Sequence, residues 1–488
     1  MNNKRNFITS IFFTGLLVLF CSSCKKLIEI PQPTDSITTT KVFATDAQAN
    51  SAMAGVYTQM IHDQTNTVSA YSGFGTGLTM LLGSMCANDL IATSVGTEGS
   101  SNYNLNRINR NDSYPYTIWS TAYHTVYGAN AVIEGIEAST STMLHDRFRK
   151  SLTAEAKFLR AFAYFYLVNL FGDVPLVMTT DFNKTVNMTR TPKQEVYNQI
   201  IKDLTEAKAA LPVDFADFAQ ERIRANKWAA AALLARVYLY TGDYVNAELQ
   251  SSEVISHSEL FQLTPELNDV FLANSKEAIW QLQQNSDGSQ GTATPEAYTI
   301  LPGKNPEGLP SVPYVLSREL TDAFEPSDKR KTNWCWSGIR NGQLTYFPYK
   351  YKIGSYNREM SVPPTEYYMV LRLAEQYLIR AEARTLGNGQ LDMAVADLNQ
   401  IRHRAGLDNL PVTLSRNEVI RKIEQEREVE FFAEWGHRWL DLKRTGRAHD
   451  VLSAVPMKQP WTGDYQLLYP IPPAEITANS KLTQNAGY

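Results

Sequence analysis

A row of glutamates near the C-terminal end is the first group of side chains that could carry out chemistry. A pair of carboxylates is what a glycoside hydrolase uses as acid and base. The same stretch, however, contains Arg421, Lys422 and Arg427 at the spacing of salt bridges along a helix. We therefore interpret the row as an ion network, solvated or buried. Its members are Glu424, Glu426, Glu428, Glu430 and Glu434.

Other signatures of catalysis or metal binding are missing from the sequence. The seven histidines form no His-Glu-x-x-His, and there is no Gly-x-Ser-x-Gly and no phosphate-binding Gly-Lys-Ser/Thr loop. Gly73–Gly77 is glycine-rich but lacks the last glycine of a dinucleotide fingerprint. His437, between Trp435 and Trp439, is interpreted as a packing residue. We expect no catalytic residue, no metal and no cofactor.

Aromatic side chains are the second group that could contact a ligand. A stretch from about 258 to 365 lacks helical periodicity and has Gly and Pro clusters, yet it is rich in tyrosine and tryptophan. Sugar rings stack on indole and phenol rings, and rigid aromatics lose little entropy on binding. The sequence therefore permits a glycan platform, although any single ring can equally belong to the core. The eight rings are Trp280, Tyr298, Tyr314, Trp334, Trp336, Tyr346, Tyr349 and Tyr351.

From this stretch and from a second irregular, polar stretch (88–115) we select candidate ligand contacts. Trp334 and Trp336 flank Cys335, so in an extended strand both indoles would point to one face and the thiol to the other. Both could then stack a sugar, or one could be core. The stacking candidates are Tyr103, Tyr114, Tyr298, Trp334, Trp336 and Tyr346, with Asn88 and Asp89 as hydrogen-bond partners.

The N-terminus carries the pattern of an export signal. Lys4 and Arg5 precede an apolar run of about ten residues, which is too short to span a bilayer, and the run ends at Ser22-Ser23-Cys24. A cysteine directly after small residues favours a lipoprotein signal, in which Cys24 becomes the lipidated N-terminus. An ordinary signal peptide is the alternative. We expect a signal peptide over 1–23 and a tether over 24–40.

Charge, apolar length and cysteine content argue against a nucleic-acid partner, a later membrane-spanning segment and a disulfide. The net charge is −4 and no basic patch stands out, which argues against a nucleic-acid partner. No later segment has the apolar length of a membrane-spanning helix. Cys86 and Cys335 are separated by about 250 residues and are interpreted as buried thiols rather than a bridge.

Helices must provide the scaffold for these residues. Apolar residues recur at helical spacing over 46–61, 153–171, 224–241 and 366–386. The last two segments end at Gly242 and Gly387, and each is followed by a second helix whose alanine, Ala247 or Ala394, would allow close packing. This is the helix–turn–helix pattern of tetratricopeptide units. The units are scattered along the chain, so we expect a helical scaffold with large insertions rather than an uninterrupted superhelix.

Several stretches together resemble the SusD/RagB family, nutrient-binding outer-membrane lipoproteins of Bacteroidetes. They occur in order over nearly the whole chain, and the set is more specific than any one of them. They are Cys24 with Leu27 and Pro31, Phe43–Tyr57, Phe158–Leu176 (containing Phe-Gly-Asp-Val-Pro), Phe324–Arg330, Leu373–Ala383, Glu426–Arg444 and the Tyr-Pro-Ile-Pro motif that begins at Tyr469.

The resemblance implies one SusD-like domain over 41–488, mostly α, with about four tetratricopeptide-like units and the loop-rich insertion at about 258–365. It also implies a lipid-anchored protein at the cell surface that captures an oligosaccharide and delivers it to a SusC-like TonB-dependent transporter, without a catalytic centre. Ligand residues differ between members and are not carried over. One departure is that Lys25 and Lys26 follow Cys24, where surface-exported lipoproteins of this group often have acidic residues.

Two other functions stay open from the sequence. The helical units could belong to a structural subunit that holds a transporter without touching nutrient, or the chain could be a lipid-anchored glycoside hydrolase. Glycan retention without hydrolysis, co-purification with a barrel without glycan binding, and release of reducing sugar would distinguish the three.

Overall fold

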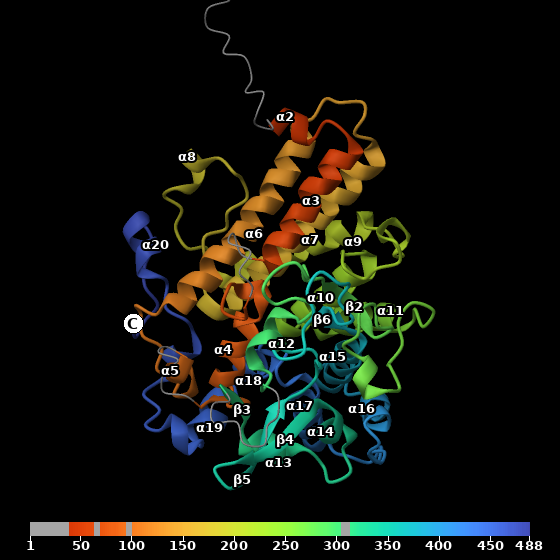
Figure 1. Ribbon diagram of the computed structural model, residues 1–488, viewed down its shortest axis with the longest axis vertical. Coiled ribbons are helices and arrows are strands. Elements are labelled where there is room, and N and C mark those ends of the chain that lie inside the picture. Colours follow the sequence, from red (N-terminus) through yellow and green to blue (C-terminus); the bar gives the residue numbers. More distant parts are fainter. Residues whose placement is uncertain (1–38, 63–68, 94–99, 304–312) are drawn as a thin grey trace, which may run out of the picture.

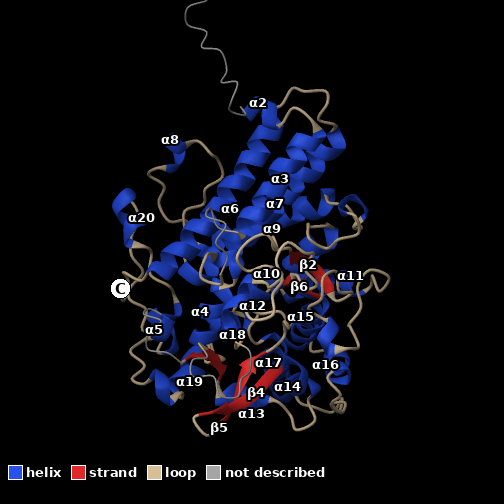
Figure 2. Ribbon diagram, in the orientation of Figure 1, coloured by secondary structure: helices blue, strands red, loops and turns tan. Residues whose placement is uncertain are grey.

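The computed structural model describes residues 39–62, 69–93, 100–303 and 313–488. Long helices dominate it, and the strands are short and paired in twos (Figure 2). Within these ranges, no helix combines the length and the apolar content needed to cross a bilayer. The predicted signal peptide and most of the tether, Cys24 included, lie outside the described residues.

The scaffold is an array in which each helix packs on the next. In Figure 1 the three helices α3, α6 and α7 run side by side through the upper half of the molecule. α11 packs on α10 and also on α15, although more than a hundred residues separate α11 from α15 in the chain. The array is therefore continuous in space although the chain is interrupted by a large insertion, which confirms the predicted helical scaffold with insertions. Its members are α3 (Asp46–Ile61), α6 (Ser113–Ala138), α7 (Asp146–Phe171), α9 (Lys193–Ala210), α10 (Lys227–Thr241), α11 (Tyr244–Ile255), α15 (Leu373–Leu386), α16 (Leu391–Arg404) and α17 (Arg416–Phe431).

Local sequence signals explain how several of these helices end. Gly172 closes α7 and Gly242 closes α10, both with positive φ, a conformation that glycine adopts at little cost. Ser415 and Glu418 form the capping box that starts α17. The helix predicted over 366–386 is shorter than expected, because its first residues form strand β6 (Tyr368–Arg372), which pairs with β2 (Ala278–Leu282).

A close crossing between short helices explains part of the glycine content. α4 (Leu78–Cys86) packs on α18 (His437–Arg444). A Cβ on Gly83 would lie 2.8 Å from the Cα of Gly436, so the two backbones approach too closely for a side chain. Gly75, in the glycine-rich stretch, is similar, since its Cβ would lie 2.4 Å from the carbonyl oxygen of Met60. Gly75, Gly83 and Gly436 therefore allow close packing.

The insertion between α11 and α15 carries most of the strands. β4 (Cys335–Arg340) and β5 (Gln343–Pro348) form a hairpin near the lower edge of Figure 1. Beside it, β3 (Tyr314–Leu316) pairs with β1 (Leu90–Ala92) from a distant part of the chain. The remaining short helices are α2 (Thr39–Val42), α5 (Ser100–Asn104), α8 (Phe182–Thr185), α12 (Pro295–Ile300), α13 (Arg318–Ala323), α14 (Lys329–Trp334), α19 (Ala448–Ser453) and α20 (Pro473–Ala478).

Candidate functional site

Two of the predicted stacking residues belong to the core. Trp334 is fully buried and donates its indole N–H to the Leu267 carbonyl oxygen at 2.9 Å. It ends α14, and buried Cys335 begins β4, so the two indoles of the Trp-Cys-Trp sequence do not share one strand face as predicted. Tyr103 is also fully buried, with its ring centroid 5.9 Å from that of Tyr469. Neither ring offers a face to a sugar, and we correct their assignment to packing residues.

The two predicted hydrogen-bond partners are buried as well. Asn88 has a positive φ of 68° in the turn before β1, and the Asp89 carbonyl oxygen accepts a hydrogen bond from the Ser317 N–H at 2.9 Å. Burial raises the pKa of the Asp89 carboxyl well above its usual range, and nearby Glu428 raises it further. Asn88 and Asp89 thus hold the β1–β3 junction and do not face solvent.

Tyr114, in contrast, is partly exposed and belongs to a first aromatic group. Its ring stacks on Tyr71 with centroids 5.8 Å apart and planes 16° from parallel. The hydroxyl of Tyr71 forms a short hydrogen bond with that of buried Tyr314. Tyr71 was missed in the sequence, although it lies in a Ser- and Gly-rich stretch of the type that yielded the other candidates.

Tyr298 lies on a segment tied to this first group. The backbone N–H of Ala70, next to Tyr71, donates to the Thr299 hydroxyl at 2.9 Å. Partly exposed Tyr298 has the guanidinium of Arg358 over its ring at 5.2 Å. Together Tyr71, Tyr114 and Tyr298 present ring surface, and Arg358 adds a hydrogen-bond donor beside it.

A second aromatic group surrounds the β4–β5 hairpin. The Trp336 indole is partly exposed and lies 5.2 Å from the ring of Tyr349 and 6.3 Å from that of Tyr356. Partly exposed Tyr346 has the Lys331 ammonium 5.2 Å above its ring. Of this group, Trp336 and Tyr346 were predicted as ligand contacts, whereas Tyr349 and Tyr356 were not. Tyr356 lies two residues after Gly354 in an irregular stretch, which is the signal that could have identified it.

The two groups lie on opposite faces of the β1–β3 ribbon. Val315 and Phe347 form a small apolar cluster against which Ile91 and Trp336 pack. Tyr314, adjacent to Val315 in β3, belongs to the first group, and neighbouring side chains of a strand point to opposite faces. The ribbon therefore positions both groups, one on each side.

The glutamates of the row are in ion pairs, as predicted, but their partners among the described residues come from other elements and not from Arg421, Lys422 or Arg427. Glu426, Glu430 and Glu434 are buried, whereas Glu424 and Glu428 are partly exposed. Glu430 contacts Arg330 at 2.9 Å, Arg372 at 2.5 Å and Arg404 at a shorter distance. Burial would raise the pKa of the Glu430 carboxyl, but the guanidinium groups of Arg404, Arg372 and Arg330 outweigh it and hold the pKa well below its usual range. A carboxylate that three guanidinium groups keep ionised cannot act as a general acid.

The histidine and the two cysteines considered in the sequence are buried as well. Buried His437 stacks on Phe431 at 4.7 Å, and burial together with nearby arginines lowers its pKa well below its usual range. Cys86 and Cys335 are free and buried, as predicted. In the part of the chain that the structure describes, no three His, Cys, Asp or Glu side chains gather as a metal site would require.

Comparisons with known proteins agree with this architecture. A family model described as "Starch-binding associating with outer membrane" matches residues 29–239, and one described as "SusD family" matches residues 339–488. A SusD-like protein of Formosa agariphila is 28% identical, covering 97% of this chain and 98% of its own length. The starch-binding protein SusD of Bacteroides thetaiotaomicron is 27% identical over 69% of this chain and 72% of its own length.

Solved structures show the same fold. A protein described as a laminarin-binding SusD-like protein superposes with a TM-score of 0.73 at 25% identity, covering 91% of this chain and 100% of that one. The helical array, the matched stretches at both ends and relatives of nearly the same length agree with each other. The chain belongs to the SusD/RagB family.

Proposed function

We propose that this protein captures a glycan at the outer membrane and passes it to a SusC-like TonB-dependent transporter. The observation that carries the proposal is the family match at both ends of the chain, in a family whose description names starch binding and the outer membrane. The similar laminarin-binding protein and the starch-binding relative point to an oligosaccharide or polysaccharide ligand. We infer that the protein acts by binding and carries out no hydrolysis.

We place the glycan contacts at the two aromatic groups, one on each side of the β1–β3 ribbon. Their partly exposed rings can stack on the apolar C–H faces of sugars, while Arg358 and Lys331 can donate hydrogen bonds to hydroxyls. The rings are held by packing and lose little freedom when a ligand binds. The proposed contacts are Tyr71, Tyr114, Tyr298, Trp336, Tyr346, Tyr349 and Tyr356.

The experiment is a glycan screen with the mature protein. Affinity electrophoresis in gels containing laminarin, starch or other polysaccharides should show retardation in at least one gel, with no reducing sugar released on long incubation. Release of reducing sugar would support the hydrolase alternative. Failure to bind any glycan, combined with stable co-purification with a barrel protein, would support the structural subunit.

A further inference from the structure

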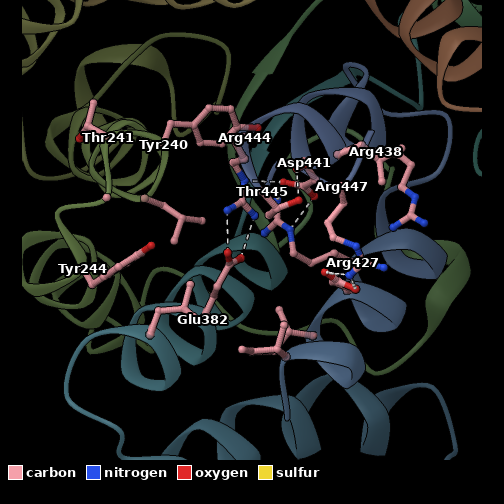
Figure 3. A pocket seen from close by; sticks show the side chains of 17 residues that line it. Tyr240, Thr241, Tyr244, Glu382, Arg427, Arg438, Asp441, Arg444, Thr445 and Arg447 are labelled. Carbon is pink, nitrogen blue, oxygen red and sulfur yellow. Dashed lines mark hydrogen bonds and ion pairs between the residues drawn. The ribbon is translucent and has the colours of Figure 1, made fainter. Parts of the chain in front are cut away.

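A cavity of about 530 Å³ opens between the helices of the scaffold, and the glycan proposal gives it no role. It lies where the C-terminal ends of α10 and α15 meet α17 and α18, so none of the aromatic groups contributes to it (Figure 3). Part of its lining comes from the 426–444 stretch, namely Arg427, Arg438, Asp441, Leu442 and Arg444. Its volume falls in the range of about 300–1,000 Å³ typical of small-molecule sites.

All three carboxylates that line the cavity are already paired with arginine. Arg444 binds Glu382 through two hydrogen bonds of 2.6 and 2.7 Å. Asp441 accepts from Arg427 at 2.7 Å and from Arg444 at 2.8 Å. Glu424 and Arg447 pair at 2.7 Å at the more exposed side. A cation would need a free carboxylate here, and the lining offers none, so the cavity does not suit a cation.

What remains without a partner is a set of hydrogen-bond donors. Arg427 is 4% exposed and its Nη1 has no hydrogen-bond partner among the described residues. The hydroxyl of Tyr240 likewise has none within the described ranges, although it is buried. Burial raises the pKa of Tyr240 well above its usual range, and the negative charge of Asp441 raises it further. The hydroxyl is therefore protonated at neutral pH and can donate a hydrogen bond. A buried guanidinium nitrogen left unpaired is costly, and an acceptor oxygen would remove that cost.

The other side of the cavity is apolar. Five aliphatic side chains line it, so a ligand made only of charged and hydroxyl groups would leave them without a partner. The apolar residues are Leu239, Leu386, Ile420, Ile423 and Leu442.

We propose that this cavity binds a small organic carboxylate whose anionic group pairs with Arg427 and Tyr240 and whose apolar body lies against Leu386 and Ile420. Asp441 occupies Nε and Nη2 of Arg427, so the ligand carboxylate would accept one hydrogen bond from Nη1 and one from the Tyr240 hydroxyl. The same chemistry is offered by a free carboxylic acid and by the C-terminal residue of a peptide. The site is independent of the glycan face.

The first test compares probes that differ in one group. N-acetyl-leucine carries the carboxylate and an aliphatic body, and N-acetyl-leucinamide lacks only the charge. Titration of the full mature protein followed by NMR should show the acid binding at least about tenfold more tightly than the amide. Equal binding of both probes, or no binding of the acid at about 10 mM, far weaker than a functional site requires, overturns the proposal.

A third probe distinguishes the two sources of carboxylate. Acetyl-Gly-Gly-Leu with a free C-terminus extends the same acid by a peptide backbone. Binding several-fold tighter than that of N-acetyl-leucine would support a peptide C-terminus as the ligand. Equal or weaker binding would support a free acid.

Variants locate the binding in the cavity. Ile420→Trp fills it and should abolish binding of N-acetyl-leucine. Tyr240→Phe removes a hydroxyl that has no partner among the described residues and should weaken binding about fivefold. Arg427→Lys keeps the positive charge but removes Nη1, the nitrogen proposed to contact the ligand, and about tenfold weaker binding is expected. Matched controls are Ile339→Trp and Arg318→Lys, at residues exposed elsewhere on the surface. Unchanged affinity in Ile420→Trp would overturn the proposal even if Arg427→Lys fails to fold.

Discussion

At the scale of single residues, burial separates ligand candidates from core residues of the same type. Trp334 and Trp336 are two positions apart, yet the first is fully buried and the second is partly exposed. Trp334 is held by its hydrogen bond to Leu267 and by the ring of Phe271 at 5.7 Å. Trp336 lies at the surface with Tyr349 and Tyr356. The two indoles therefore have different roles despite their spacing.

We expect alanine substitutions at the two tryptophans to have opposite effects. Trp334→Ala should lower the free energy of unfolding by about 3–5 kcal/mol, because it leaves a large cavity in packed interior. Trp336→Ala should leave the melting temperature nearly unchanged and weaken glycan binding by about 1–3 kcal/mol, as at other aromatic hot spots. Thermal unfolding and affinity electrophoresis measure the two effects.

The matched control for Trp336→Ala is Tyr127→Ala, because Tyr127 is 58% exposed on scaffold helix α6. It should change neither stability nor binding. If Trp336→Ala folds and binds every glycan as before, glycan binding would be assigned to Tyr71, Tyr114 and Tyr298 instead.

At the scale of elements, α7 is the centre of the scaffold. It packs against α6 on one side and α9 on the other. Phe162 in its middle is fully buried, with ring centroids 5.0 Å from Trp280 in β2 and 5.2 Å from Trp435, which follows α17. One helix thus links the array, the insertion and the C-terminal region.

Phe162→Ala should therefore destabilise the fold without altering the ligand face. The expected loss in free energy of unfolding is about 3–5 kcal/mol, from lost transfer energy and the cavity left behind. Leu378→Ala, in α15, should cost about 2–5 kcal/mol for the same reason. Urea unfolding gives the stability, and glycan affinity of the folded fraction should equal that of the wild type. Loss of affinity in a normally stable variant would contradict the scaffold assignment.

At the scale of the whole molecule, the ion network joins segments far apart in the chain. Glu430 in α17 contacts arginines from α14, β6 and α16, and Arg372 and Arg404 also pair with Glu277. These groups are buried, so each charge depends on its partners for compensation. The network therefore connects the insertion to the helical array.

Glu430→Gln should lower the free energy of unfolding at pH 7 by about 3–5 kcal/mol, because three buried guanidinium groups lose their shared carboxylate. The pKa of Glu430 in the folded protein is depressed, so its contribution is present above the pKa of the unfolded chain and is lost as pH falls below it. The difference between wild type and variant in urea unfolding should shrink on acidification. Exposed Glu137→Gln is the control, and a difference independent of pH would contradict the prediction.

We also predict that the whole molecule is held at the membrane by lipid on Cys24. Acyl chains on that cysteine would together suffice for stable attachment. Cys24→Ala should release the protein to the soluble periplasmic fraction or leave it unprocessed, as cell fractionation would show. A variant that still sediments with outer membrane through its own affinity would disprove the lipid anchor. Cys24→Ser serves as a second variant of nearly the same size.

Much of the architecture can be predicted from the sequence because helix formation depends on patterns of neighbouring residues. The apolar stripe of α3 and the glycine that closes α10 were predicted, and each acts within a few residues. Gly172 at the end of α7 and the capping box of α17 are local signals of the same kind. The charges along α17 likewise predicted paired rather than catalytic carboxylates, but the arginines that pair with Glu430 come from other elements and were not predicted. The sequence by itself thus determined the helical scaffold and the family.

The tertiary structure decided which residues reach solvent. Tyr103, Asn88 and Asp89 occur in polar, irregular sequence, but long-range packing buries them, and no local pattern records that. The strand β6 likewise depends on its partner β2, far away in the chain, and the sequence at 368–372 alone predicted a helix. Continuity of the array through α11 and α15 is also a long-range contact. Local signals determine secondary structure, whereas burial and adjacency are properties of the whole packed chain.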